Sequence, residues 1–375
     1  MQKRASEHQR FVTAGRHAIR HLLTPLASGM TSVVMVATAA TLAACVTVVE
    51  DDASGATVAA GPDGAEAVAA TSGSGEGLPG DAPAVLEAHG DMINSIGVSP
   101  DGTTLITGSY KKEVVVWDMA TRTQRLSFDG HGNWIVRGYA FHPSGDRVAS
   151  ADEAGQVLLW DPASGSLLTE PVNYPGAAVS LAYSPDGTTL VTTFNNGEVR
   201  VLDGSTLSPL TEEPLTGHKR PKASVHSSQF APDGSMFVTA ATDSSLQRWD
   251  PVALAPLGEP IGSLSDLRHI AFADSKTLVV SSLHGPVIWD IQAATRLLEV
   301  DLPANGPPKA MAVSPDGTLI AEGHVGSRIH FVRTRDGAYL GERDGEADVM
   351  DLVFSPTGGV LLSSHRDGSV RFWTF

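Results

Sequence analysis

Three histidines recur at almost the same interval in the C-terminal part of the chain, and their type and spacing point first to metal chemistry. His284, His324 and His365 lie 40 and 41 residues apart. Imidazoles from neighbouring repeats can converge on a zinc or copper ion. Equivalent positions in neighbouring repeats are usually too far apart for metal bonds of about 2 Å, and no acidic residues stand nearby to support the ligands. The sequence therefore predicts no metal site and no cofactor.

A second recurring position carries positive charge. Six residues before the proline, or its equivalent, of each of seven regularly spaced turns, the chain places Asn94, Arg137, Val179, His226, Arg268, Lys309 and Met350. Three of the seven are Lys or Arg, whereas about 0.4 would be expected from composition. A basic collar in an acidic body can attract an anionic partner or an acidic side chain. The competing interpretation is that solvated strand starts accept any polar residue.

Trp134 is the one tryptophan of six that does not end a repeat. It lies on the segment that leads into the collar position of the second repeat, and exposed Trp and Arg are the usual energetic anchors of interfaces. In the alternative interpretation, Trp134 only covers the edge of a blade. The predicted partner-binding residues are Arg137, Arg268, Lys309, His226 and Trp134.

The elements that must position these residues are short strands joined by turns. Pro presets φ at the second position of a type I turn, Asp is tolerated at the third, and Gly relieves the fourth. Alternating apolar and polar residues flank the turns, as in half-buried antiparallel strands. The turns are 99–102, 142–145, 184–187, 231–234, the degraded 273–276, 314–317 and 355–358.

Downstream of each turn, a third strand closes on Trp-Asp or a substitute. The pairs are Trp117-Asp118, Trp160-Asp161, Leu202-Asp203, Trp249-Asp250, Trp289-Asp290, Val332-Arg333 and Trp373-Thr374. With Gly-His at 130–131 and 217–218, the region from about residue 83 to 375 resembles the WD-repeat β-propeller family. Seven repeats over about 293 residues give about 42 residues each, which suits four-stranded blades. We therefore predict an all-β fold, a seven-bladed β-propeller of four-stranded antiparallel blades.

The resemblance also implies that His218, Asp243 and Trp249 belong to one hydrogen-bonded network within a blade, and that His89 and His131 are structural. Repeats 3, 5 and 6 lack most of the network residues. The last repeat is one strand short, while Ala84-Val85-Leu86-Glu87 reads as a spare strand upstream of the first. We predict that this N-terminal strand completes the last blade, closes the ring and removes an exposed edge.

The N-terminal segment has the pattern of an export signal or a membrane anchor. Residues 1–20 carry five basic residues against one acid, and residues 21–49 carry no formal charge. Leu42-Ala43-Ala44-Cys45 resembles the bacterial lipoprotein processing box, and Cys45 is the chain's one cysteine. We predict that Cys45 is lipidated after removal of a signal peptide, residues 1–44. An uncleaved signal anchor is the alternative, because the uncharged run can span a bilayer of about 30 Å.

Residues 45–82 are rich in Gly, Ala, Ser and acid and are expected to form a disordered tether to the propeller, residues 83–375. Downstream of residue 44 the chain holds 21 basic and 41 acidic residues, from totals of 26 and 42 less the 5 and 1 before it, a net charge of −20. Nucleic-acid binding is disfavoured, because that affinity comes mainly from Lys and Arg neutralising phosphates.

Catalytic signatures are absent: the sequence has no nucleophile elbow, no Gly-rich phosphate loop and no His-Glu-x-x-His. We therefore predict that the chain is not an enzyme. The expected function is an extracytoplasmic interaction scaffold, exported and tethered to the membrane at a bacterial cell envelope, that binds an unknown protein partner with an acidic contact surface. The alternative is a propeller that binds a small anion or a metal at the mouth of its channel, with or without catalysis.

Overall fold

Each repeat folds as strands that pair antiparallel around its Pro-Gly turn. In blade 1, β2 (Ile93–Val98) turns into β3 (Thr104–Ser109), followed by β4 (Val114–Asp118) and β5 (Gln124–Phe128). In the first turn the Gly102 amide donates to the Ser99 carbonyl at 2.8 Å, and Gly102 takes a φ of 72°. The Ser99 hydroxyl donates to Asp101 Oδ1 at 2.6 Å. The recurring aspartates therefore build turns, as the sequence predicts.

The computed structural model describes residues 77–132, 134–262, 267–303 and 307–375. The chain divides into two units, Met1–Glu66 and Ala67–Phe375, and all described residues belong to the second. Cys45, the signal or anchor segment and most of the predicted tether lie outside the described residues. Within the described ranges, the structure has no helix with the length and apolar character needed to cross a membrane.

The strands of the remaining blades follow the same order from the innermost outward. Blade 2 holds β6 (Val136–Phe141), β7 (Val148–Asp152), β8 (Gln156–Trp160) and β9 (Val172–Asn173), and blade 3 holds β10 (Ala178–Tyr183), β11 (Thr189–Phe194) and β12 (Val199–Asp203). Blade 4 holds β13 (Val225–Phe230), β14 (Phe237–Ala241), β15 (Ser245–Asp250), β16 (Ala255–Pro256) and β17 (Ile261–Gly262). Blade 5 holds β18 (Ile270–Phe272), β19 (Thr277–Ser282), β20 (Gly285–Asp290) and β21 (Thr295–Glu299). Blade 6 holds β22 (Pro308–Val313), β23 (Leu319–His324), β24 (Arg328–Arg333) and β25 (Tyr339–Asp344), and blade 7 holds β26 (Val349–Phe354), β27 (Val360–His365) and β28 (Ser369–Thr374).

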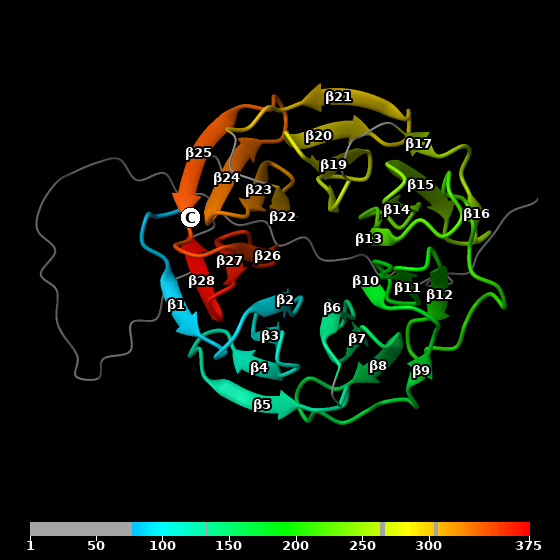
Figure 1. The fold of residues 1–375 in the computed structure, drawn as a ribbon, viewed down its shortest axis with the longest axis horizontal. Helices are drawn as coiled ribbons and strands as arrows, with labels where there is room; N and C mark the ends of the chain where they lie inside the picture. Colours follow the sequence, from blue (N-terminus) through cyan, green and yellow to red (C-terminus); the bar gives the residue numbers. More distant parts are fainter. Residues whose placement is uncertain (1–76, 133, 263–266, 304–306) are drawn as a thin grey trace, which may run out of the picture. The chain divides into compact units, whose positions relative to one another are not determined.

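The seven sheets stand around a central axis with the first strand of each blade innermost (Figure 1). Neighbouring innermost strands contact each other all the way round, from β2 to β6 and finally from β26 back to β2. In blade 3 the fourth strand is reduced to two isolated bridges, Val199 with Leu215 and Leu202 with Pro209. The predicted seven-bladed, all-β propeller is confirmed.

The ring is closed by the N-terminal strand, as predicted. β1 (Ala84–Glu87) pairs antiparallel with β28, with Ala84 opposite Phe372 and Leu86 opposite Val370. Figure 1 shows this blue strand on the outer edge of the red C-terminal blade. The contacts start a few residues earlier, because the Gly80 amide donates to the Thr374 carbonyl at 3.0 Å. Chain segments more than 280 residues apart in the sequence thus share one blade.

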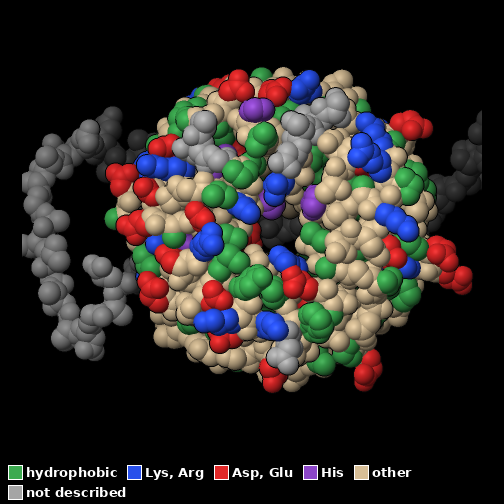
Figure 2. Space-filling model, viewed as in Figure 1, with side chains coloured by type: hydrophobic (Ala, Val, Ile, Leu, Met, Phe, Trp, Pro, Cys, Tyr) green, Lys and Arg blue, Asp and Glu red, His purple; other side chains and the backbone are tan. Residues whose placement is uncertain are grey.

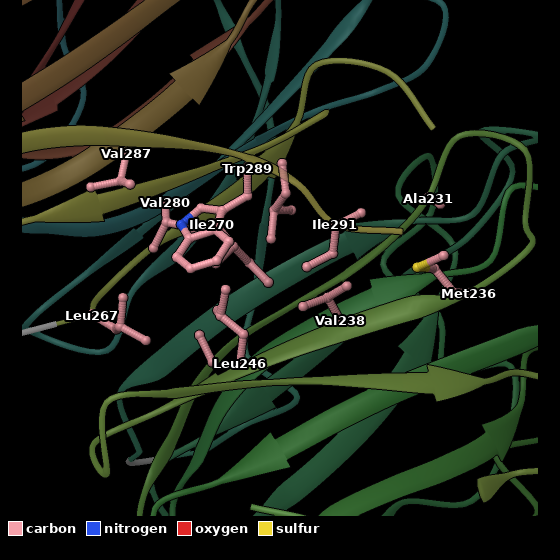
Figure 3. Packing of buried hydrophobic residues seen from close by; sticks show 12 residues of the cluster. Ala231, Met236, Val238, Leu246, Leu267, Ile270, Val280, Val287, Trp289 and Ile291 are labelled. Atoms are coloured by element: carbon pink, nitrogen blue, oxygen red, sulfur yellow. The ribbon is translucent and has the colours of Figure 1, made fainter. Parts of the chain in front are cut away.

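The core lies between the blades, and the repeat-ending tryptophans fill it. Trp289 of blade 5 packs against Leu246 and Val238 of blade 4 (Figure 3). Trp249 packs in the same way against blade 3, and Trp373 against blade 6. At the junction of blades 5 and 6 the corresponding residue is Val332, which is fully buried beside Ile288 and Val300. Val332 is therefore the smallest side chain at this position, where blade 3 has Leu202 and the other five blades have tryptophan.

Candidate functional site: the collar face

Six of the seven collar positions are β-bulge residues. In six blades the register of the innermost pair shifts, so that the ladder skips the second residue of the first strand. The skipped residues are Asn94, Arg137, Val179, His226, Lys309 and Met350. Arg268 lies two residues before β18. A bulge leaves its extra residue outside the ladder and re-aims its side chain. Six blades thus present one bulge residue each at the same end of the innermost strands.

Positive charge on this collar is concentrated in three adjacent blades. His226, Arg268 and Lys309 come from blades 4, 5 and 6, whose innermost strands β13, β18 and β22 are neighbours. His269, next to Arg268, adds a fourth side chain to this group, and the four side chains together form the arc. The pKa of His269 is lowered to about 4, mainly by burial and also by the nearby charges of Arg268, His226 and Lys309, against a hydrogen bond with the Lys309 backbone that raises it. His269 is therefore neutral near pH 7, and Arg268 and Lys309 carry the positive charge of the arc. The sequence analysis missed His269, although its position beside Arg268 was the available signal.

Figure 2 shows Lys, Arg and His side chains gathered around the central opening, whereas many Asp and Glu side chains lie toward the rim. His226, Arg268 and Lys309 are half-buried. They are therefore reachable from solvent yet partly shielded from it, and partial shielding strengthens electrostatic attraction. The arc can hold an anionic group at the channel mouth.

Blade 2 supplies the other two predicted residues, Arg137 and Trp134. In contrast to the arc, this part of the collar pairs its basic residue with an acidic one. The Arg137 guanidinium is ion-paired with Glu153 across the blade. Trp134 lies on the connection that enters β6 and is 53% exposed. An exposed tryptophan beside an exposed ion pair suits the rim of a protein contact better than an anion pocket. The sequence analysis missed Glu153 because it sits on the loop after the second strand, 16 residues from Arg137.

The rest of the collar carries no basic charge. Asn94 donates its amide to the Val136 carbonyl at 3.2 Å and so joins blades 1 and 2. Beside Met350, Asp351 accepts hydrogen bonds from the Ile96 and Leu352 amides at 3.0 and 2.9 Å. Burial raises the pKa of Asp351 to about 6. Apart from Arg137, which is ion-paired with Glu153, the basic residues of the collar therefore lie in blades 4 to 6.

The blade histidines take structural roles, as the family resemblance implies. In blade 4, His218 bonds Thr239 and Ser245, each at 2.8 Å, and Trp249 Nε1 donates to the same Thr239 hydroxyl at 2.8 Å. Ser245 in turn donates to Asp243 at 2.5 Å. Blade 2 repeats the arrangement with His131, Ser150 and Trp160, and blade 1 with His89, Thr107 and Trp117.

The three regularly spaced histidines do not converge on one another. His365 belongs to the blade 7 network, where it bonds Ser363 at 2.7 Å and the Ala347 carbonyl at 3.0 Å. His324 stacks edge-on against His330 of its own blade, with ring centroids 4.9 Å apart. His284 lies in the turn after β19. Among the residues that the structure describes, no group of three or more His, Cys, Asp or Glu side chains is arranged to hold a metal ion.

Fold and collar together define the class of protein: a seven-bladed β-propeller with WD-type hydrogen-bond networks and a charged channel mouth. Residues 80–118, 122–161, 208–250 and 337–374 match the family model of the WD domain, G-beta repeat. These repeats and the relatives below support a WD-repeat propeller family for this chain, and propellers of this family generally bind protein partners.

Several WD-repeat proteins are similar to this chain. Periodic tryptophan protein 2 of Arabidopsis thaliana is 28% identical over 208 residues, covering 54% of this chain and 22% of that protein. The small ribosomal subunit protein RACK1z of Oryza sativa subsp. japonica is 28% identical, covering 31% and 36%. Cilia- and flagella-associated protein 52 of Sus scrofa is 23% identical, covering 78% and 47%. The chain spans less than half the length of each of these relatives.

Proposed function

We propose that this chain is a membrane-tethered, extracytoplasmic scaffold that binds an acidic surface of a protein partner on its collar face. The observation that carries the proposal is the arc of His226, Arg268, His269 and Lys309, in which Arg268 and Lys309 supply positive charge to a chain whose net charge downstream of residue 44 is −20. Opposite charge at the mouth of an acidic body steers an anionic surface to one orientation. The exposed Trp134 supplies an apolar anchor on the same face.

The collar is tested by charge reversal in two matched double variants. Arg268→Glu with Lys309→Glu inverts the arc, whereas Lys276→Glu with Arg296→Glu makes the same change at exposed positions toward the other end of blade 5. We expect crosslinking and capture from native envelopes to recover a protein with the wild type and with the control, but not with the arc variant. Recovery of the same proteins by all three would contradict the proposal.

Location rests on Cys45 and the basic, then uncharged, N-terminal pattern. A Cys45→Ala variant is expected to accumulate as an unprocessed precursor, measured by mass and by metabolic labelling with a fatty acid. Normal maturation without label would exclude the lipid anchor and favour the uncleaved signal anchor. Protease accessibility of the propeller in intact cells or spheroplasts tests the extracytoplasmic placement separately.

A small-anion site is the second candidate, and the convergence of the same four side chains favours it. Such a site predicts saturable binding of inorganic phosphate or succinate by calorimetry, lost in the arc variant but unaffected by Trp134→Ala. Partner binding predicts sensitivity to both. No catalytic role is proposed for either set of residues.

A further inference from the structure

A pocket of about 550 Å³ lies between blades 5 and 6, at the end of the blades that carries the turns and therefore opposite the collar. Its walls include Ile288 and Leu298 of blade 5 and Leu340 of blade 6. Leu297, which is 54% exposed, lies at its edge. The size is that of a small-molecule site, which is typically apolar with a few polar groups.

The pocket exists because two family features are missing at this junction. In five blades a repeat-ending tryptophan packs against the preceding blade, and blade 3 has Leu202 at this position, whereas blade 6 has the smaller Val332. In addition, four of the other turn glycines face the turn proline of the preceding blade, as Gly358 faces Pro315, and Gly187 faces the His142 side chain. The degraded blade 5 turn has no proline, and Gly317 faces the Ala273 backbone instead. Ala273, Asp274 and Gly317 therefore line open space.

Two adjacent polar groups of the pocket lining are buried without a hydrogen-bond partner in the described part of the chain. They are Arg333 Nε and Thr334 Oγ1. Thr334 is 6% exposed, and Arg333 donates a hydrogen bond from Nη1 to Asp336 Oδ2 at 3.0 Å. Buried polar groups are nearly always satisfied in native proteins, because leaving one unpaired costs free energy. Both groups can donate, so a carboxylate of a bound ligand would satisfy them together.

The remaining charged side chains of the lining are of opposite sign. Asp274 and Arg335 both line the pocket, and Arg335 Nε lies 3.8 Å from Asp336 Oδ2. Burial raises the pKa of Asp274, but hydrogen bonds from the Lys276 and Thr277 amides outweigh this and leave the pKa below its usual value. An ionised Asp274 repels a second anionic group, which disfavours a polyacidic peptide.

We propose that this pocket binds a small aliphatic monocarboxylate. Its carboxylate accepts from Arg333 Nε and Thr334 Oγ1, and its chain lies against Ile288, Leu298 and Leu340. The site is separate from the collar and does not depend on the scaffold function proposed above.

Calorimetry with decanoate, below its micellar concentration, tests the site on the wild-type propeller. We expect saturable binding to one site, and binding of decanol, which has the same chain without the charge, at least about tenfold weaker. Equal affinity for the two ligands, or no saturable binding of decanoate, would overturn the proposal. So would tighter binding of a short acidic peptide than of decanoate.

Variants locate the site. Thr334→Val and Arg333→Gln should each weaken decanoate binding by about tenfold or more, whereas Thr206→Val in blade 3 and Arg366→Gln in blade 7, away from the pocket, should leave it unchanged. Val332→Trp, which restores the family wedge, should abolish binding in a folded protein. The collar variant Arg268→Glu with Lys309→Glu should bind decanoate normally, so failure of the scaffold proposal and failure of this one are distinguishable. Unchanged affinity in both Thr334→Val and Arg333→Gln would refute the assigned site.

Discussion

Blades 4 and 6 bury opposite chemistry at the same register position. In blade 4, Thr239 lies opposite Ser228 and holds together Trp249 and His218. In blade 6 the equivalent position, opposite Met311, is Glu322, which is fully buried. Ser281 of blade 5 donates to Glu322 Oε1 at 2.5 Å, and His324 Nε2 lies 3.9 Å from Oε2. His330 is directly opposite Glu322 on the next strand.

The difference shows that the propeller ring needs the strands but not the network in every blade. A neutral hydroxyl satisfies an indole and an imidazole without any charge, whereas a buried carboxyl must stay protonated or pay for desolvation. Burial raises the pKa of Glu322 to about 8, against a smaller opposing effect of the Ser281 hydrogen bond. At this register position, blade 6 therefore buries an ionisable carboxyl group, whereas blade 4 buries a neutral hydroxyl group.

The largest effect should come from the tryptophan that blade 4 has and blade 6 lacks. Trp249→Ala is expected to destabilise the propeller by about 3–5 kcal/mol, because it empties a fully buried position and leaves the Thr239 network incomplete. The matched change Val332→Ala in blade 6 should cost about 2 kcal/mol. Equilibrium urea unfolding measures both. Equal losses of unfolding free energy in the two variants would mean that the Trp249 side chain and its hydrogen-bond network do not stabilise blade 4 more than Val332 stabilises blade 6.

Glu322 should make stability fall as pH rises. Its pKa is about 8 when folded and 4.5 in the reference state, so between these values the folded chain binds more protons than the unfolded chain. Stability is then present below about pH 4.5 and is lost progressively toward pH 8, by roughly 2–4 kcal/mol. Glu322→Gln should remove this slope, as followed by urea unfolding between pH 5 and 9. An unchanged slope would contradict a protonated Glu322.

His218 should have the opposite effect on the pH dependence of stability, because its protonation makes stability fall as the pH decreases. Burial lowers its pKa from 6.5 to about 4, against a smaller opposing effect of Asp243. Between these values the unfolded chain binds the extra proton, so stability present above pH 6.5 is lost as pH falls toward 4, by roughly 2–3 kcal/mol. His218→Gln should flatten this limb relative to wild type. His365 and His330, whose pKa values are also lowered, leave a residual slope.

Blade 5 offers the smallest and most selective test. Val280 occupies the position of Thr239, and Trp289 Nε1 has no hydrogen-bond partner in the described structure. Val280→Thr supplies the missing acceptor while burying a hydroxyl, so we expect a change within about 1 kcal/mol of wild type. A loss well above that would show that the network geometry cannot be installed by one residue. Thr239→Val is the reciprocal control in blade 4.

Much of the fold was predictable because the repeat acts locally. The Pro-Asp-Gly turns, the strand alternation and the Trp-Asp endings each fix a hairpin from residues close in sequence, and they were sufficient for the blade number. Pairing of β1 with β28 followed from counting strands, since the last blade was one short. The structural roles of His89, His131 and His218 followed from the family resemblance.

The candidate site was predictable only in part. The spacing identified the collar positions, but not that they are bulges, nor that His269 joins Arg268 and Lys309. The pairing of Arg137 with Glu153 and the separation of His284, His324 and His365 depend on how loops and blades meet in space. Their roles in partner binding remain predictions.

The sequence by itself determined the propeller, because each repeat encodes its own strands and turns. Only the tertiary structure decided what the junctions between blades contain: a carboxyl–imidazole cluster in blade 6 and a pocket beside Val332. The cluster is completed by Ser281 of blade 5, 41 residues from Glu322, and the pocket is lined by residues of blades 5 and 6, so both depend on how neighbouring blades pack. The sequence pattern of a single repeat carries no information about the volume left between neighbouring blades.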